Sequence, residues 1–402
     1  FLQRSKGRVG LVTELNDMIY LDYAASTPVD ERVLEAMTVA MTVHGNYANP
    51  SSTHSAGRYS VELISTAARH LAGLLNTQPD RLIWTSGATE SDNLAIFGAA
   101  RYREDRGRHL VSMRTEHKAV TDPFSALARM GFDVTWLDPE PDGLLDTGKL
   151  QDALRDDTQL VSVMHVNNET GVVQDIAAIG AACRERGVLF HVDAAQSCGK
   201  LPIDLEALPV DLMSVTAHKF YGPKGIGALY MADRRGVNVE PLFYGGGQQR
   251  GLRPGTLPTQ QIVGFGATAA IATECQARDL GHLEALRDRL WQGIHDVPGV
   301  RINGSLEHGF PGILNVSVED IEGESLLLAL EPLCVATGSA CNSKSQEPSY
   351  VLRALGLDDD LAQSAIRFSF GRPTTRAEVD RAIELYRDGV AKLRRLAPGR
   401  AA

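Results

Sequence analysis

A carboxylate and an amine stand at the ends of two apolar stretches of this 402-residue chain. Asp193 follows Val188–Val192 in the segment HVDAAQS, and Lys219 follows Leu212–Val215 in the segment SVTAHKFYGPKGIGAL. About one strand–helix–strand step separates the two residues, so we expect them to meet at one edge of a sheet. A lysine amine forms Schiff bases with aldehydes, and a carboxylate can keep a pyridine nitrogen protonated. Together they are typical of proteins that hold pyridoxal 5′-phosphate (PLP), although Asp193 alone could cap a helix and Lys219 alone could be a solvated surface residue.

A second group of residues can hold the phosphate of such a cofactor. Thr85–Glu90 lies at a strand-to-helix junction, where unpaired N–H groups and the positive end of the helix attract anions. Ala88 and Thr89 begin this helix. Thr216 and His218 flank the residue before the lysine, so their side chains can face the phosphate while the amine faces the aldehyde. The alternative interpretation of Thr85–Glu90 is an ordinary capped helix.

Three further side chains are candidates for contacts with the cofactor ring. His117 follows the expected strand His109–Met113, where an imidazole can stack on a pyridine ring and move a proton near neutral pH. Asn168 and Gln196 follow two later strands, and their amides can bind the phenolic oxygen or a substrate carboxylate. A surface histidine and ordinary turn residues are the alternatives.

Other candidates concern the substrate. Cys341 stands among small residues in ATGSACNS, so we expect a reachable thiol on a mobile loop, whereas Cys183 and Cys334 fit a buried, inert type. Arg367 can grip a carboxylate through two hydrogen bonds, or it can form a surface ion pair. The glycine-rich loop Gly245–Thr256 can cradle an anion, or it can be a plain connection.

The elements that must position these residues follow an alternating pattern. From Val29 to Ala277 helical and strand patterns alternate, which predicts an α/β domain with a mostly parallel mixed sheet covered on both faces. The expected helices and strands of this region are Asp30–Val43, Ser55–Leu75, Arg81–Thr85, Ala88–Glu104, His109–Met113, Asp133–Leu137, Leu160–His165 and Val188–Val192.

A helix at His282–Ile294, short strands at Ile313–Val318 and Ile366–Phe370, and an amphipathic helix at Arg376–Leu396 predict a smaller α+β domain. We therefore expect a large PLP-binding domain at 29–277, and a small domain at 1–28 and 278–402 that carries the Cys341 loop.

Composition excludes several classes of protein. A formal net charge of −10 argues against a nucleic-acid surface. The sequence contains no stretch of about 18 apolar residues, so we expect no membrane span. The five cysteines are odd in number and form no CxxC, which disfavours disulfides and a zinc or other metal site. Residues 1–17 show no signal-peptide core, so we expect a cytoplasmic protein.

The chain resembles the cysteine desulfurases, in the NifS/IscS-like group of the class-V aminotransferase fold, in the motifs SGATESDNLAI, EHKAV, MHVNNETGVVQDI, HVDAAQS, AHKFYGPKGIGALY, RPGTLP, GSACNS, EPSYVLRALGL and IRFSFGR. The resemblance runs from about Tyr20 to Leu396 in the order of the family. It implies the fold type I of PLP-dependent transferases. The family's commoner Ser-Gly before His-Lys is Thr216-Ala217 here, and threonine keeps the hydroxyl.

The resemblance also implies a role for each candidate. Lys219 would form the Schiff base, Asp193 would bind the pyridinium nitrogen, and His117 would stack on the ring and transfer protons. Asn168 and Gln196 would contact the phenolic oxygen, and the phosphate would be bound by Ala88, Thr89, Thr216 and His218. Thr256 would contact the phosphate of the other subunit's cofactor. Arg367 and Asn168 would bind the substrate carboxylate, and Cys341 would take the sulfur.

The implied reaction converts L-cysteine to L-alanine in a homodimer. Its sulfur would pass, as a persulfide on Cys341, to acceptor proteins for iron–sulfur cluster assembly or for tRNA and cofactor thiolation. Relatives that serve the iron–sulfur scaffold carry a longer C-terminal tail than this sequence, so the acceptor stays open. The alternatives are a selenocysteine lyase or cysteine sulfinate desulfinase, an aminotransferase that makes no use of Cys341, and a non-catalytic sulfur-relay module.

Overall fold

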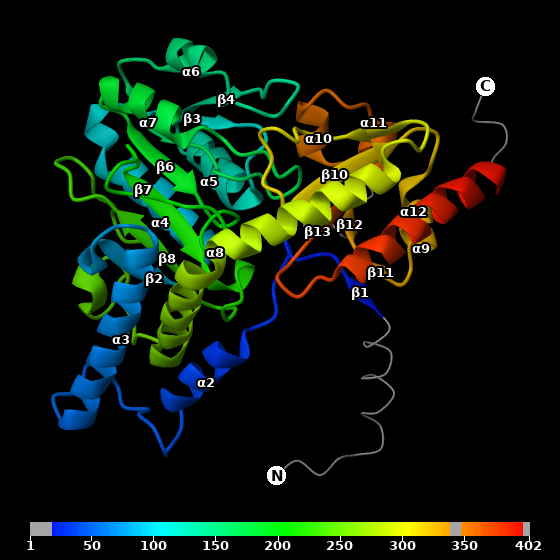
Figure 1. Ribbon diagram of the computed structural model, residues 1–402. Helices are drawn as coiled ribbons and strands as arrows, with labels where there is room; N and C mark the ends of the chain where they lie inside the picture. Colours follow the sequence, from blue (N-terminus) through cyan, green and yellow to red (C-terminus); the bar gives the residue numbers. More distant parts are fainter. Residues whose placement is uncertain (1–17, 338–346, 397–402) are drawn as a thin grey trace. The chain divides into compact units, whose positions relative to one another are not determined.

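The computed structural model describes residues 18–337 and 347–396, which divide into two compact units (Figure 1). The larger unit comprises Ser26–Asn168 and Val172–Leu280. The smaller unit comprises the described parts of Phe1–Ala25, Glu169–Gly171 and Gly281–Ala402. The domains predicted from the sequence, 29–277 and 1–28 with 278–402, remain predictions as units that fold independently.

The larger unit is built on a seven-stranded sheet with the strand order β2–β8–β7–β6–β5–β3–β4. Only β8 is antiparallel to its neighbours, and the other strands run parallel to one another. The mostly parallel mixed sheet predicted from the sequence is therefore confirmed. Its strands are β2 (Leu82–Thr85), β3 (His109–Met113), β4 (Asp133–Leu137), β5 (Thr158–Ser162), β6 (Leu189–Asp193), β7 (Leu212–Thr216) and β8 (Gly227–Met231).

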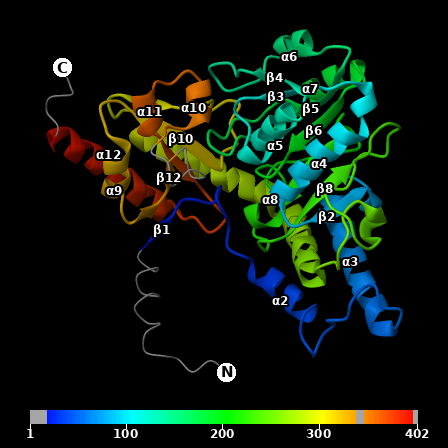
Figure 2. The same ribbon diagram turned by 180° about the vertical axis from the view of Figure 1, so that it is seen from behind.

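Helices cover both faces of this sheet because alternate strand residues are apolar on both sides (Figures 1 and 2). Phe190 and Val192 of β6 belong to the core shared with α3, α7 and α8, whereas Leu189 belongs to the core shared with α4 and α5. Each large side chain buried in this way stabilises the fold by about 1.5–3 kcal/mol. The helices of this unit are α2 (Glu31–Val39), α3 (Ser55–Leu74), α4 (Ala88–Tyr102), α5 (Lys118–Arg129), α6 (Thr147–Ala153), α7 (Ile176–Glu185) and the part of α8 (Thr259–Ile294) up to Leu280.

Two predicted ends in the larger unit are wrong by three residues or more, and several other bounds differ by one or two residues. Helix α2 has Asp30 as its N-cap and ends at Val39 instead of Val43, because the chain folds back and the N–H of Asn46 donates to the Val39 carbonyl over 2.8 Å. Strand β5 ends at Ser162 instead of His165, since its pairing with β3 ends there.

The smaller unit has an antiparallel sheet in the order β12–β13–β10–β9 and a parallel pair, β1 with β11. Phe368 and Tyr386 meet edge to face in its core, with ring centroids 6.0 Å apart. Among residues 18–337 and 347–396, no helix is long and apolar enough to cross a membrane. The elements of this unit are β1 (Ile19–Tyr20), β9 (Val300–Ile302), β10 (Ile313–Val318), α9 (Gly323–Ala329), β11 (Leu333–Cys334), β12 (Ala336–Thr337), α10 (Tyr350–Ala354), α11 (Asp359–Gln363), β13 (Ile366–Ser369) and α12 (Arg376–Leu396). The predicted helix at His282–Ile294 is the second part of α8, which begins much earlier, at Thr259.

Candidate active site

The amine predicted to hold the cofactor lies directly after a central strand. Strand β7 ends at Thr216, and a single 3₁₀ turn, Ala217–Lys219, follows it. The turn is tight, because a Cβ on Gly222 would lie only 2.6 Å from the Cβ of Ala217. Lys219 is half-buried at the carboxyl end of the sheet.

Asp193 ends the neighbouring strand β6 and is buried. Its Oδ1 accepts a hydrogen bond from the N–H of Ala195 over 2.8 Å, so the carboxylate also closes the turn after the strand. Burial raises the pKa of Asp193, while the Ala195 N–H, His117 and Lys219 oppose that shift. The structure thus brings together the amine, the carboxylate and the imidazole that the sequence singled out.

The tautomer of the neutral His117 imidazole follows from its backbone contact. The residue is the N-cap of α5, and its Nδ1 accepts a hydrogen bond from the N–H of Ala119 over 3.1 Å. Because Nδ1 is an acceptor, the proton of the neutral imidazole resides on Nε2. His117 can therefore offer Nε2–H as a proton donor while its ring orientation is fixed by the helix.

Helix α4 begins without a side-chain cap. Its N-cap is Gly87, with φ 154° and ψ 179°, a conformation that favours glycine. The Thr85 hydroxyl stabilises this turn. It donates a hydrogen bond to the Gly87 carbonyl over 3.1 Å and lies 2.7 Å from the Ser91 hydroxyl. The N–H groups of the first turn of α4 are thus donors that an anion can use.

Other segments converge on this turn. A Cβ added to Gly87 would lie 4.0 Å from the Thr216 hydroxyl, and one added to Gly227 would lie 2.6 Å from the Gly87 backbone. Ala88 is half-buried and Thr89 is exposed in the first turn of α4. Glycines at these positions allow the start of α4, the end of β7 and the start of β8 to approach one another closely.

The predicted polar contacts of the ring are placed as follows. Gln196 is buried, and its Oε1 accepts a hydrogen bond from Lys200 Nζ over 2.9 Å. The N–H₂ group of the same amide is a donor, as a contact with a phenolic oxygen requires. Asn168 is half-buried, two residues beyond the isolated bridge at Val166. His218 Nδ1 lies 3.3 Å from the Ser26 hydroxyl. Burial, and to a smaller extent the positive charges of nearby lysines, lower the pKa of His218 to about 4, so His218 is neutral.

A buried polar row, which sequence reasoning missed, crosses the sheet beside Asp193. His191 Nδ1 lies 2.8 Å from the Ser162 hydroxyl, and its Nε2 lies 2.9 Å from the Ser214 hydroxyl. Asp92 of α4 is fully buried, 3.6 Å from His191 Nε2, and neither of its oxygens has a donor at normal hydrogen-bond geometry among the described residues. Alternation along β6 was the available signal, because residues 191 and 193 point to the same face of the sheet.

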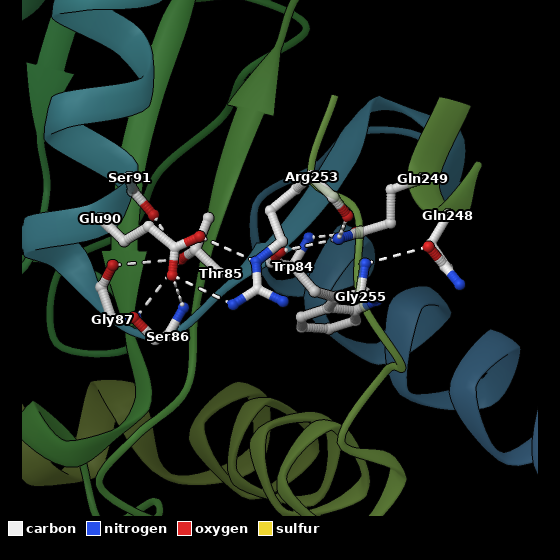
Figure 3. Close-up of polar contacts among 10 residues, drawn as sticks. All are labelled: Trp84, Thr85, Ser86, Gly87, Glu90, Ser91, Gln248, Gln249, Arg253 and Gly255. Atoms are coloured by element: carbon white, nitrogen blue, oxygen red, sulfur yellow. Dashed lines mark hydrogen bonds and ion pairs between the residues drawn. The ribbon is translucent and has the colours of Figure 1, made fainter. Parts of the chain in front are cut away.

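The loop Gly245–Thr256 is attached to the same turn of α4 (Figure 3). Gln249 Oε1 accepts from the N–H of Trp84 over 2.6 Å, and its Nε2 donates to the Trp84 carbonyl over 2.9 Å. Arg253 forms an ion pair with Glu90 of α4 over 2.8 Å. Thr256, the predicted phosphate contact, is exposed at the end of the loop.

The smaller unit contains Arg367, which is buried and whose Nη2 lies 2.8 Å from Asp22 Oδ1. Cys341 lies outside the described residues. Burial raises the pKa of Cys183 and of Cys198 to about 12, so neither thiol ionises near neutral pH. Cys334 is half-buried rather than buried, and burial together with Asp22 raises its pKa too.

Comparison with known proteins identifies the family. Residues 19–382 match the class-V aminotransferase family. The cysteine desulfurase IscS of Vibrio campbellii is 56% identical over 381 residues, which are 94% of this chain and 94% of that protein. The chain belongs to the class-V aminotransferase family, among the cysteine desulfurases.

Solved structures of this family have the same fold. One, described as a NifS-like protein, has a TM-score of 0.87 and 36% identity, and the match covers 94% of this chain and all of that one. Another, described as SspA in complex with cysteine, has a TM-score of 0.78 and 38% identity over 88% of this chain and 98% of that one.

Enzymes of this family depend on PLP, and so does this chain. The family, fold class, cofactor and enzyme class predicted from the sequence are therefore confirmed. The residues present fit the cofactor, since an amine, a buried carboxylate and an uncapped helix end with a glycine cradle lie at one end of the sheet. The individual roles of these residues remain predictions.

Proposed function

We propose that this cysteine desulfurase converts L-cysteine to L-alanine and transfers the sulfur to its own Cys341 before passing it on. The observation that carries the assignment is the grouping of Lys219, Asp193 and His117 beside the uncapped start of α4. PLP, when bound, supplies an electron-accepting ring conjugated to the α-carbon of the substrate. The protein must then bind, orient and move protons around that ring.

Lys219 Nζ is the group that would hold the cofactor aldehyde and later take the α-proton of the substrate. The Asp193 carboxylate would hold the proton on the pyridine nitrogen, because a buried carboxylate is stabilised by an adjacent cation. His117 would stack on the ring and donate from Nε2. Ala88, Thr89, Thr216 and His218 would bind the phosphate, and Gln196 and Asn168 the phenolic oxygen.

Sulfur transfer needs a thiolate that reaches the substrate. The Cys341 thiolate would attack the sulfur of cysteine, so that the carbon–sulfur bond breaks, a sulfur–sulfur bond forms and the carbon fragment leaves as alanine after protonation. The raised pKa values of Cys183 and Cys198 support this choice, since thiols that stay protonated are poor nucleophiles. Arg367 would bind the substrate carboxylate, in exchange for or beside its contact with Asp22.

The proposal extends to the assembly and to the partners. We propose a homodimer in which Thr256 of each subunit reaches the other subunit's cofactor. The persulfide would pass to an iron–sulfur scaffold protein or to a thiolation enzyme in the cytoplasm. The free thiols of Cys183, Cys198, Cys275 and Cys334 suit a reducing compartment.

The assignment of Lys219 is tested by trapping the cofactor. Borohydride reduction of the yellow holoenzyme followed by peptide mapping should place the label on Lys219, and Lys219→Ala should lose turnover. A label on Lys224 or Lys200, which also lie in this region of the chain, would show that the assignment is wrong.

The assignment of Cys341 is tested by following the sulfur. Mass spectrometry after addition of cysteine should find one extra sulfur on the peptide that contains Cys341. Cys341→Ser should still change the cofactor spectrum on binding cysteine but release no alanine. Sulfur on Cys334 or Cys198, or a normal rate of alanine release by the variant, would contradict the proposal. Formation of a keto acid without sulfur transfer would identify an aminotransferase instead.

A further inference from the structure

A carboxylate occupies the turn to which the proposed function assigns a phosphate. Glu90 is the third residue of α4, and its Oε2 accepts a hydrogen bond from the N–H of Ser86 over 2.7 Å. A carboxylate in the first turn of a helix is ordinarily favourable. Here the same turn must also accept the dianionic phosphate of PLP, and two neighbouring anions repel each other.

Arg253 supplies the compensating charge from the Gly245–Thr256 loop (Figure 3). Its Nε lies 2.8 Å from Glu90 Oε1 and its Nη2 lies 3.3 Å from Glu90 Oε2, a two-pronged contact. Both side chains are largely shielded from water, with exposed fractions of 21% and 14%. Burial of Glu90 favours its neutral form, but Arg253 and Ser86 outweigh burial and lower the pKa of Glu90, so the pair is ionised at neutral pH.

The guanidinium is held in place independently of the ion pair. Arg253 lies over the ring of Phe243, 5.5 Å from its centroid. Four residues earlier, the left-handed residue Gln249 (φ 49°) bonds both backbone groups of Trp84 on β2, and its Nε2 also donates to the Arg253 carbonyl over 3.2 Å. The loop thus presents Arg253 to Glu90 in a fixed position, since the same segment is bonded at two places to the β2–α4 region.

We propose that Arg253 is a positioning residue that neutralises Glu90 and thereby lets the first turn of α4 bind the phosphate of PLP. It acts through Glu90 and not by touching the phosphate. This inference rests on the proposed phosphate site at Ala88 and Thr89. It predicts that the harm done by removing Arg253 comes from the uncovered charge of Glu90, so that removing that charge as well should undo it.

The test compares the apoenzyme forms of the wild type, Arg253→Met, Glu90→Gln and the double variant in binding PLP and pyridoxal, which lacks the phosphate. Arg253→Met should weaken PLP about tenfold, the effect of one unfavourable charge contact of moderate strength, and should leave pyridoxal unchanged. Glu90→Gln keeps the acceptor for the Ser86 N–H and should bind PLP at least as well as the wild type. The double variant should bind PLP within about threefold of the wild type.

Two further variants serve as controls. Arg253→Lys keeps the charge and should bind PLP within about threefold of the wild type. This variant tests the role of the charge even if Arg253→Met does not fold. Arg234→Met removes a matched ion pair with Asp211 (2.6 Å) in the same unit and should not change the ratio of PLP to pyridoxal affinity.

Each contrary result has its own meaning. A double variant as weak as Arg253→Met would overturn the inference, because loop order or direct contact would then explain the loss. Equal weakening of PLP and pyridoxal would overturn it too, since the phosphate would not be the group affected. A wild type that does not prefer PLP over pyridoxal would refute the proposed phosphate site itself.

Discussion

Two buried titratable side chains, Asp92 and His191, lie near Asp193 and are not among the proposed catalytic residues. Asp92 is a fully buried carboxyl group beside a buried imidazole, His191, whose pKa burial lowers to about 3. Burial and the neighbouring carboxylate of Asp193 raise the pKa of Asp92 well above its usual range, although the Ser214 hydroxyl opposes this. His191 is therefore neutral near neutral pH, and burial favours the neutral form of Asp92. Asp193 can then carry the negative charge that a pyridinium nitrogen requires.

A neutral Asp92 predicts a specific dependence of stability on pH. Between the pKa of Asp92 in the unfolded chain and its higher pKa in the folded protein, only the unfolded chain ionises, so the free energy of unfolding falls as the pH rises. Asp92→Asn removes this loss. It should be more stable than the wild type near neutral pH, by about 1.4 kcal/mol for each unit of the pKa shift, and the difference should shrink as the pH falls toward about 4.

Urea unfolding of apoenzyme at several pH values measures this difference. Asp138→Asn, which alters an exposed carboxylate paired with Arg114, should show no such trend. A variant at Asp92 that is less stable than the wild type by the same amount at every pH would mean that the carboxyl is ionised or serves only packing.

Residues close in sequence or at successive strand ends could be grouped without a structure. Lys219, Asp193 and His117 each follow an apolar strand, and parallel strands bring their carboxyl ends together. The pair Glu90 and Arg253 could not be predicted in this way. The two residues are 163 positions apart, and only the fold of the Gly245–Thr256 loop brings them into contact.

At the scale of elements, the junction of β2 and α4 depends on the close approach of the backbone at the start of β8. Gly227 begins β8 beside Gly87, and a Cβ at Gly227 would lie 2.6 Å from the Gly87 carbonyl carbon and 2.7 Å from its Cα. Real Cβ atoms do not come so close to backbone atoms, so the turn would have to shift. The glycine at the start of β8 therefore shapes the proposed phosphate site from the neighbouring strand.

Gly227→Ala should therefore impair both stability and cofactor binding. We expect the free energy of unfolding to fall by about 1–3 kcal/mol, the usual range for overpacking, and PLP to be released more readily on dialysis. Gly73→Ala is the control, because a Cβ at this position of α3 meets no atom within 4 Å, and it should be neutral or raise stability by about 0.5–1 kcal/mol. Unchanged PLP retention in Gly227→Ala would show that the turn tolerates the shift.

Most elements could be predicted because their apolar periods are clear, but the ends of several could not. β3, β4, β10 and α12 have the predicted bounds. α2 and β5 end elsewhere because tertiary contacts decide where they stop, as the bond from Asn46 to Val39 does for α2. α8 was underestimated because its first half is buried against the sheet and lacks a clear amphipathic period.

On the scale of the whole molecule, the larger unit carries many large apolar side chains that a single chain leaves exposed. Within residues 29–61 and at 243–244 these are Val29, Leu34, Val39, Met41, Val43, Tyr47, Tyr59, Val61, Phe243 and Tyr244. Exposed apolar side chains that form one continuous patch are typical of surfaces that another protein covers. A second copy of the chain is the partner that the proposed sharing of Thr256 requires.

Thr256→Ala is expected to release PLP several-fold faster than the wild type without changing the proposed dimer. The reason is that the variant would remove the hydroxyl that we propose donates to a phosphate, a charge-assisted contact. Sedimentation measures the assembly, and absorbance after dialysis measures the retained cofactor. A monomer that turns over cysteine at the wild-type rate would rule out shared sites.

The attachment of Gln249 to Trp84 has a consequence for how the molecule behaves in concentrated solution. β2 is one of the two edge strands of the seven-stranded sheet, and an open edge is a template for strands of other molecules. The Gln249 carboxamide takes up both the N–H and the carbonyl of Trp84, in the middle of that edge, as a neighbouring strand would. The Gln249 side chain therefore occupies the backbone groups through which a strand of another molecule would pair at Trp84.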